Sequence, residues 1–198
     1  RAPFLGCFGM HEWAMVYRQT EPDHRHRVPL RLGQAGTDAV LEAHRVRCTH
    51  FDAFRFFTPD AVPHNELQPT RELQVALEQP GCLHATMDLY KWSAKLGEAV
   101  PSELVVDCFE LALDTRVLDM QASPYDLRSL GYEPIPIETP EGKAAYAAAQ
   151  RGLMTRAEPL RTDLIEACYT LIDLTAQGDR RRSARPALQT ARGAVGHG

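Results

Sequence analysis

The chain has 198 residues, of which 44% are hydrophobic, and its formal net charge is −4. This composition excludes a disordered chain and a polycation, so a contact with nucleic acid would have to come from a local basic patch. The sequence contains no run of about 18 or more apolar residues and no secretory leader pattern, so we expect no membrane contact.

The chain contains five cysteines, and it does not begin with Met. An odd number at scattered positions argues against a disulfide framework and favours the reducing cytoplasm. The start at Arg1 resembles the middle of a domain, which leads us to expect a preceding N-terminal segment. The cysteines are Cys7, Cys48, Cys82, Cys108 and Cys168.

The N-terminal third has an irregular pattern. Residues 28–33 alternate like an edge strand, and residues 44–57 alternate as well. If 44–57 is a strand, Cys48, His50 and Asp52 share one face. If it is a helix, Cys48 and Asp52 still share a face.

The rest of the chain has the three- and four-residue spacing of amphipathic helices. We expect a short helix within 69–79, a helix from Gly81 to Gly97 and another over 101–120. Residues 131–138 form an extended connector because each proline disfavours helix at the preceding residue.

The last predicted helix begins at Thr139 and Pro140, a capping residue followed by a proline. Pro159 should kink or restart it, and Gly178 should end it. The sequence therefore predicts a mainly α fold with a small extended or β part in the N-terminal third. One domain covers 1–177, followed by a disordered tail over 178–198 that is rich in Arg, Ala and Gly.

Two Cys-x-His clusters are the most unusual local feature. A zinc site could use thiolate and imidazole ligands, with Cys7 or His11 as substitutes. The predicted ligands are Cys48, His50, Cys82 and His84. The structural alternative is that buried cysteines act as small hydrophobes.

Cys82 follows Pro80 and Gly81, where a helix should begin. Helix N-terminal amides would lower the pKa of its thiol and make it a nucleophile, with His84 or His50 as base. The alternative is a plain turn that enters a helix.

Acid/base chemistry is a third possibility. His84 and Asp88 are four residues apart, so they share a helix face with Lys91. Asp88 is the first candidate carboxylate, Glu12 the second, and His84 would orient Asp88. Three aromatic residues close to these acids would hold a planar base: Trp13, Tyr90 and Trp92. Three arginines could bind phosphates: Arg45, Arg47 and Arg55.

Four segments resemble an actinobacterial protein group whose members are labelled 3-methyladenine DNA glycosylase. They read FGMHEWAMVYR at 8–18, RCTHFDAFRFFTP at 47–59, CLHATMDLYKW at 82–92 and LDMQASPYDL at 118–127. The resemblance spans roughly residues 4–172. The chain lacks the lysine/aspartate and zinc patterns of the well-known alkylpurine glycosylases, so the resemblance assigns no residue a role.

The resemblance implies a DNA-repair N-glycosylase, a hydrolase that releases alkylated purines from damaged double-stranded DNA. Such an enzyme flips the base, stacks it and stabilises a cationic centre with a carboxylate. One alternative is a zinc- or iron-dependent enzyme that acts on a small molecule through the Cys/His cluster. A further alternative is a non-catalytic binding protein.

Overall fold

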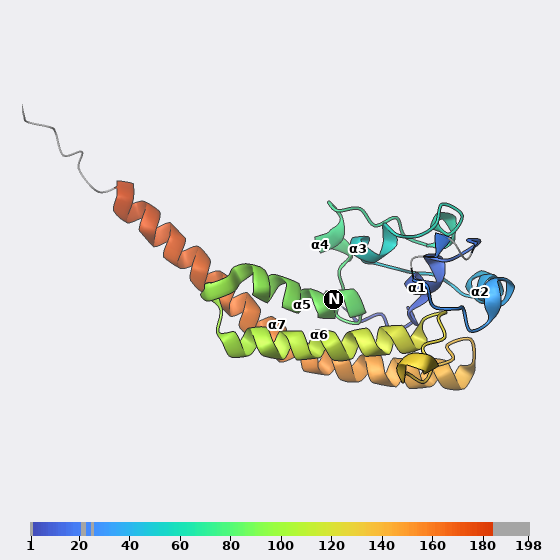
Figure 1. Ribbon diagram of the computed structural model, residues 1–198. Coiled ribbons are helices and arrows are strands. Elements are labelled where there is room, and N and C mark those ends of the chain that lie inside the picture. The colour runs from blue at the N-terminus through green and yellow to red at the C-terminus, as the bar shows by residue number, and fades with distance from the viewer. Residues whose placement is uncertain (1, 21–22, 25, 184–198) are drawn as a thin grey trace, which may run out of the picture.

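The computed structural model describes residues 2–20, 23–24 and 26–183. The chain is mainly helical, as the sequence predicts (Figure 1). The α-helices are α1 Met10–Ala14, α2 Gly33–Glu42, α3 Phe51–Phe54, α4 Gln74–Leu77, α5 Leu83–Leu96, α6 Ser102–Ala122 and α7 Pro140–Ser183. Short 3-10 turns are η2 Val62–His64, η3 Gly97–Ala99 and η4 Arg128–Leu130. None of the helices in the described part is long and apolar enough to cross a membrane.

Helices α5, α6 and α7 pack along one another, and the shorter elements α1 to α4 gather at one end of this bundle (Figure 1). The predicted apolar spacing builds the bundle, because one face of each helix is buried. On α6 the buried stripe includes Leu104, Cys108, Leu111 and Leu118. Gly97 ends α5 with a φ of 56°, a conformation that glycine adopts without strain.

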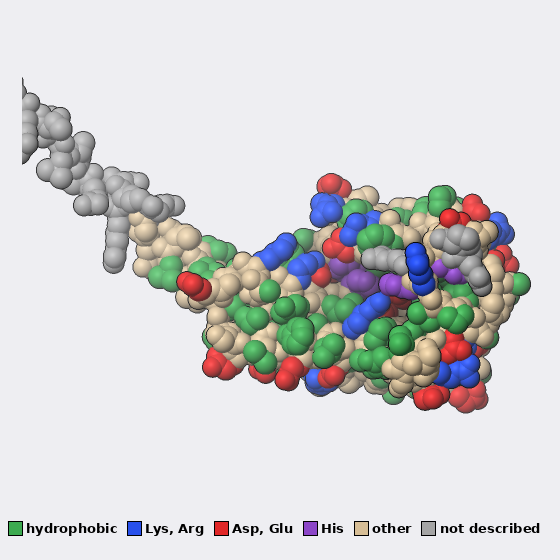
Figure 2. Space-filling model, in the orientation of Figure 1, with side chains coloured by type: hydrophobic (Ala, Val, Ile, Leu, Met, Phe, Trp, Pro, Cys, Tyr) green, Lys and Arg blue, Asp and Glu red, His purple; other side chains and the backbone are tan. Residues whose placement is uncertain are grey.

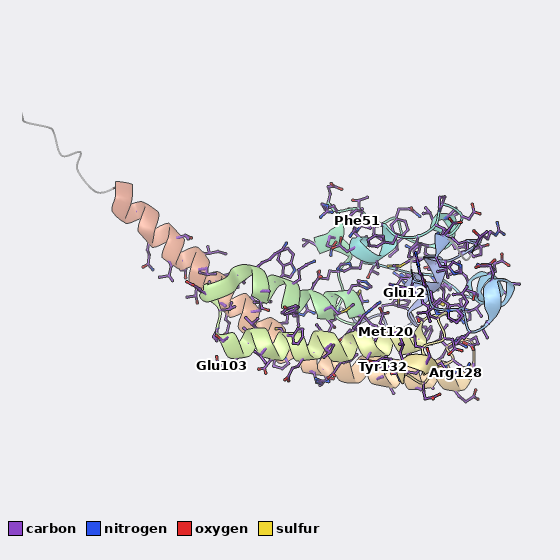
Figure 3. All side chains as sticks on the ribbon, in the orientation of Figure 1. Glu12, Phe51, Glu103, Met120, Arg128 and Tyr132 are labelled. Atoms are coloured by element: carbon purple, nitrogen blue, oxygen red, sulfur yellow. The ribbon has the colours of Figure 1, made fainter. Side chains whose placement is uncertain are left out.

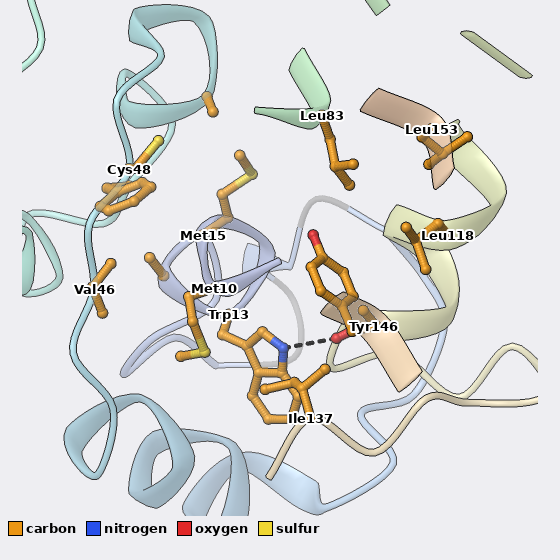
Figure 4. Close-up of a cluster of buried hydrophobic side chains, with 14 of the residues drawn as sticks. Met10, Trp13, Met15, Val46, Cys48, Leu83, Leu118, Ile137, Tyr146 and Leu153 are labelled. Carbon is orange, nitrogen blue, oxygen red and sulfur yellow. Dashed lines mark hydrogen bonds between the residues drawn. The ribbon is translucent and has the colours of Figure 1, made fainter. Parts of the chain in front are cut away.

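Helix α1 is buried over its whole length and lies against the C-terminal end of α6. The Nε1–H of Trp13 donates to the carbonyl oxygen of Ala122 at 2.9 Å, drawn as the dashed line in Figure 4. Trp13 belongs to the same core cluster as Ile137 and Tyr146. This packing fixes the side chains that follow Met10 against α6, and Figure 3 shows Glu12 and Met120 at this end of the molecule.

The predicted small β part is reduced to two isolated bridges in the described residues. The predicted strand over 28–33 forms a single antiparallel pair, Leu30 with Tyr125. In the segment 44–57, neither the strand nor the single helix forms. The side chain of Asn65 accepts from the backbone N–H of Cys48 at 2.6 Å and donates to its carbonyl at 3.0 Å. Because one side chain satisfies both groups, the segment needs no partner strand.

The end of the chain differs from the prediction in two places. Helix α7 continues through Pro159 without the predicted restart, although it changes direction along its length (Figure 1), and it passes Gly178 and ends at Ser183. A proline removes one backbone hydrogen bond, a cost that a long helix packed on α5 and α6 tolerates. The part of the predicted tail over 184–198 lies outside the described residues.

Candidate functional site

Three ionisable side chains from α1 and α6 meet in the interior: His11, Glu12 and Asp119. His11 is 2% exposed and Asp119 is fully buried. The Nε2 atom of His11 lies 2.9 Å from Oδ1 of Asp119 and 4.0 Å from Oε1 of Glu12. From α6, Nη1 of Arg116 donates to Oδ2 of Asp119 at 2.6 Å and to Oε1 of Glu12 at 3.1 Å.

These charges shift one another's pKa values. Burial alone would raise the pKa of Asp119, but the neighbouring His11 and Arg116 outweigh it and hold this pKa well below its usual range. Burial alone would lower the pKa of His11, but the charge of Asp119 outweighs it and raises this pKa well above 6.5. Asp119 is therefore ionised, and the cluster holds a compensated set of buried charges.

Nε2 of His11 and Oδ1 of Asp119 form a buried ion pair 2.9 Å apart, although neither atom makes a well-aligned hydrogen bond. Within the described part of the chain, one group of ligating atoms lies within 4.8 Å of one another, and it belongs to His11, Glu12 and Asp119. A mixed imidazole and carboxylate set suits a divalent transition metal.

His84, at the start of α5, extends the cluster. Its ring packs edge-on against His11, with the ring centres 4.7 Å apart, and lies 5.3 Å from the ring of His50. Burial, helped by the charge of His11, lowers the pKa of His84 to about 3. His84 is therefore neutral at physiological pH and keeps a nitrogen lone pair for a metal or a proton.

Asp88 forms a second cluster with Lys91 of the same helix face and with His50, which takes the place predicted for His84. Its Oδ2 lies 2.6 Å from Nζ of Lys91 and 3.1 Å from Nε2 of His50. Nδ1 of His50 accepts from the backbone N–H of Asp52, so in a neutral ring the proton is on Nε2, which contacts both Asp88 and the side-chain amide of Gln74, the latter at 2.7 Å. Burial opposes these contacts, but together they lower the pKa of Asp88 and keep it ionised.

The two Cys-x-His segments do meet in space. Cys48 and Cys82 line one small cavity together with Cys7. However, the predicted ligands Cys48, His50, Cys82 and His84 are not among the described ligating atoms that converge within 4.8 Å. The thiol of Cys48 instead donates to the carbonyl of His50 at 3.6 Å.

Burial also makes the thiols poor nucleophiles. Burial raises the pKa of Cys82 to about 12 and raises that of Cys48 well above 9. The helix amides near Cys82 lower its pKa only slightly, so the expected activation by the helix N-terminus does not occur. Desolvation decides the outcome because Cys82 is 9% exposed.

The predicted base clamp is not assembled. Trp13 is fully buried, and its indole N–H is used in the core, so no base can stack on it. Tyr90 packs against Phe109 of α6 with ring centres 5.1 Å apart. Trp92 is half exposed on α5, with Lys95 4.9 Å from its ring centre.

The three predicted phosphate-binding arginines all lie beside carboxylates. Arg45 and Arg47 both pair with Glu66, the latter at 3.9 Å, and Arg55 lies 3.2 Å from Asp52. A phosphate would have to compete with these carboxylates for each guanidinium. The arrangement weakens the case for a free basic surface at this place.

A cavity of about 170 Å³ adjoins the buried cluster at Glu12 and Arg116. His84 of α5, Asp52 of α3 and His26 also line it. Figure 2 shows histidine side chains gathered beside a hollow on this face, with Lys and Arg side chains around it. The site is therefore a pocket with acidic, basic and neutral imidazole groups in reach of a small molecule.

Sequence reasoning missed Asp119 and Arg116. Asp119 lies on the apolar stripe of α6, between Leu118 and Ala122, which are both buried. A charged residue on a buried helix face was the available signal, because such a position needs a partner. That partner, His11, comes from a helix more than a hundred residues away in the chain.

No family model, no curated protein and no solved structure matches the chain.

Proposed function

We propose that the protein is a metal-dependent enzyme acting on a small molecule, with a divalent transition metal held by His11, Glu12 and Asp119. One observation carries the proposal. Two atoms that can both ligate a metal, Nε2 of His11 and Oδ1 of Asp119, face each other 2.9 Å apart in the interior, and neither makes a well-aligned hydrogen bond. A divalent cation that displaced the proton of His11 would be ligated by both atoms.

The surrounding groups fit this role. Arg116 binds the second oxygen of Asp119, which orients the carboxylate and leaves Oδ1 turned toward His11. His84 is neutral, so it is available as a further ligand or as a base beside the pocket. When bound, a metal would act as a Lewis acid on water or on a substrate oxygen.

The test is metal binding to the purified chain. EDTA-treated protein is dialysed against Zn²⁺, Mn²⁺ or Co²⁺, and bound metal is measured by elemental analysis. We expect about one equivalent per chain, with Co²⁺ giving a visible spectrum without a thiolate charge-transfer band. His11→Ala and Glu12→Gln should each weaken binding by about 10-fold or more.

Cys82→Ser is the matched control, because it changes a ligand predicted from the sequence but not one of the three converging residues. It should bind metal as the unchanged protein does. Circular dichroism checks that each variant is folded. The ligand set is wrong if the unchanged protein binds no more metal than the folded His11→Ala variant. It is also wrong if Cys82→Ser is the variant that loses metal binding.

A second candidate, the N-glycosylase, is favoured by the state of Asp88. This carboxylate is ionised, half-buried and held by His50 and Lys91, which is what stabilising a cationic transition state requires. Release of base from duplex DNA that contains 3-methyladenine tests it. Asp88→Asn should raise the barrier by about 3–4 kcal/mol with little change in Tm, and the absence of any base release would end this candidate.

A further inference from the structure

A second cavity opens beside the proposed metal site. Its volume is about 160 Å³. Its walls are mostly apolar, with Val28, Met120, Leu127 and Leu130 among them. Met120 belongs to α6, one residue after Asp119, so the same helix presents a ligand to the metal site and a wall to this cavity.

The two cavities share part of their lining, and the two together are called the cleft. Glu12, His26 and Arg116 line both of them. Their volumes of about 160 and 170 Å³ together reach the lower end of the roughly 300–1,000 Å³ typical of small-molecule sites. The cleft therefore has a polar half at the buried charges and an apolar half beyond Arg116.

We propose that the cleft binds an amphipathic small molecule, with its polar head group in the first cavity and an alkyl or aryl tail in the second. The head-group part rests on the proposed function, because a bound metal would ligate that group. The tail part rests only on the apolar lining. Leu130 is 62% exposed, so it lies at the edge of the cavity and limits how much of the tail is covered.

The lining argues for a hydrocarbon tail rather than a second charged group. The charged residues of the apolar cavity are those that it shares with the metal site, and Arg116 already binds two carboxylates there. A second anionic group would find no further cation among the lining residues. A hydrocarbon tail gains affinity simply by leaving water.

The experiment uses a series of straight-chain carboxylates, from propanoate to decanoate, and measures their binding affinities by calorimetry or ligand-observed NMR. Each is titrated into the zinc-loaded protein and into the EDTA-treated protein. We expect affinity to rise about fourfold per added methylene until the cavity is full, and then to level off. This rise should occur in both forms, because the tail does not touch the metal.

The head group is tested with the matching alkanols. Replacing the carboxylate by a hydroxyl should weaken binding to the zinc-loaded protein and change little in the EDTA-treated protein. If both forms respond alike to the head group, the metal proposal fails while the tail site stands. If affinity does not depend on chain length in either form, the tail site is overturned.

Leu130→Asp locates the tail. A carboxylate at the cavity edge should weaken octanoate binding by about tenfold or more, because it must lose water beside the tail. Leu113→Asp is the control, since Leu113 is 55% exposed on α6 and lines neither cavity. Both positions are exposed, so both variants should fold. Equal effects of the two changes would refute the proposed location.

Discussion

Two glycines of α7 allow a sharp test of how this helix starts. Gly142 lies in the first turn, and its N–H donates to Oγ1 of Thr139 at 3.0 Å, which caps the helix as the sequence predicts. A Cβ at Gly142 would lie 3.1 Å from the backbone nitrogen of Ile137 and closer still to the carbonyl group of Pro136. Gly152 is in the same helix, but a Cβ there would meet nothing within 4 Å.

Gly142→Ala should therefore destabilise the protein, and Gly152→Ala should stabilise it. The clash is with backbone, so the turn before α7 must open. Overpacking costs about 1–3 kcal/mol and a lost cap about 1 kcal/mol, giving a loss of about 2–4 kcal/mol. Gly152→Ala should add about 0.5–1 kcal/mol, because alanine loses less backbone freedom than glycine in a helix.

Equilibrium unfolding in urea, followed by circular dichroism, measures both changes. With an m-value of about 2 kcal/mol/M, a loss of 3 kcal/mol lowers the midpoint by about 1.5 M. Gly152→Ala should raise the midpoint slightly. If Gly142→Ala unfolds at the same midpoint as Gly152→Ala, the start of α7 is not packed against Pro136 as described.

Two further predictions concern stability. Trp13→Phe removes the hydrogen bond to Ala122 and leaves a buried carbonyl unpaired, which should cost about 1–3 kcal/mol in urea unfolding; an unchanged midpoint would contradict this. Arg31 donates to both oxygens of Glu138 at 2.6 Å, and although burial opposes it, this contact lowers the pKa of Glu138 below 4.5. The stabilisation from this ion pair is therefore complete above pH 4.5 and is lost as the pH falls through the lowered pKa of Glu138. Glu138→Gln should be less stable than the unchanged protein at neutral pH, and its stability should fall less steeply on acidification.

The helices were predictable because their signals are local. The apolar stripe of α6 and the cap at Thr139 lie within single segments of the sequence. Residues 44–57 were not predictable, because Asn65 replaces a partner strand with its side chain. The continuation of α7 past Pro159 also depends on packing that local propensity does not contain.

The candidate site was predictable in part. Glu12, His84 and Asp88 stand out in the sequence as polar residues close to aromatic ones, and the structure places Glu12 and His84 on one pocket. Of the two interpretations of Cys82, the activated thiol was wrong in direction, because burial raises its pKa and a sequence pattern gives no measure of burial. The contact of His11 with Asp119 joins segments far apart in the chain, so only the fold reveals it.

The charged cluster lies where burial makes charges costly. Placing Asp119, His11 and Arg116 in the interior removes charges from water, a penalty that their mutual attraction rarely exceeds. The stripe of α6 could be completed by an apolar side chain at position 119, since its neighbour Leu118 is already buried in the core. The helix instead keeps a fully buried carboxylate that is ionised and forms an ion pair with His11. Strongly shifted groups beside a pocket are typical of functional sites, and here Arg116, which binds the same carboxylate, lines two neighbouring cavities.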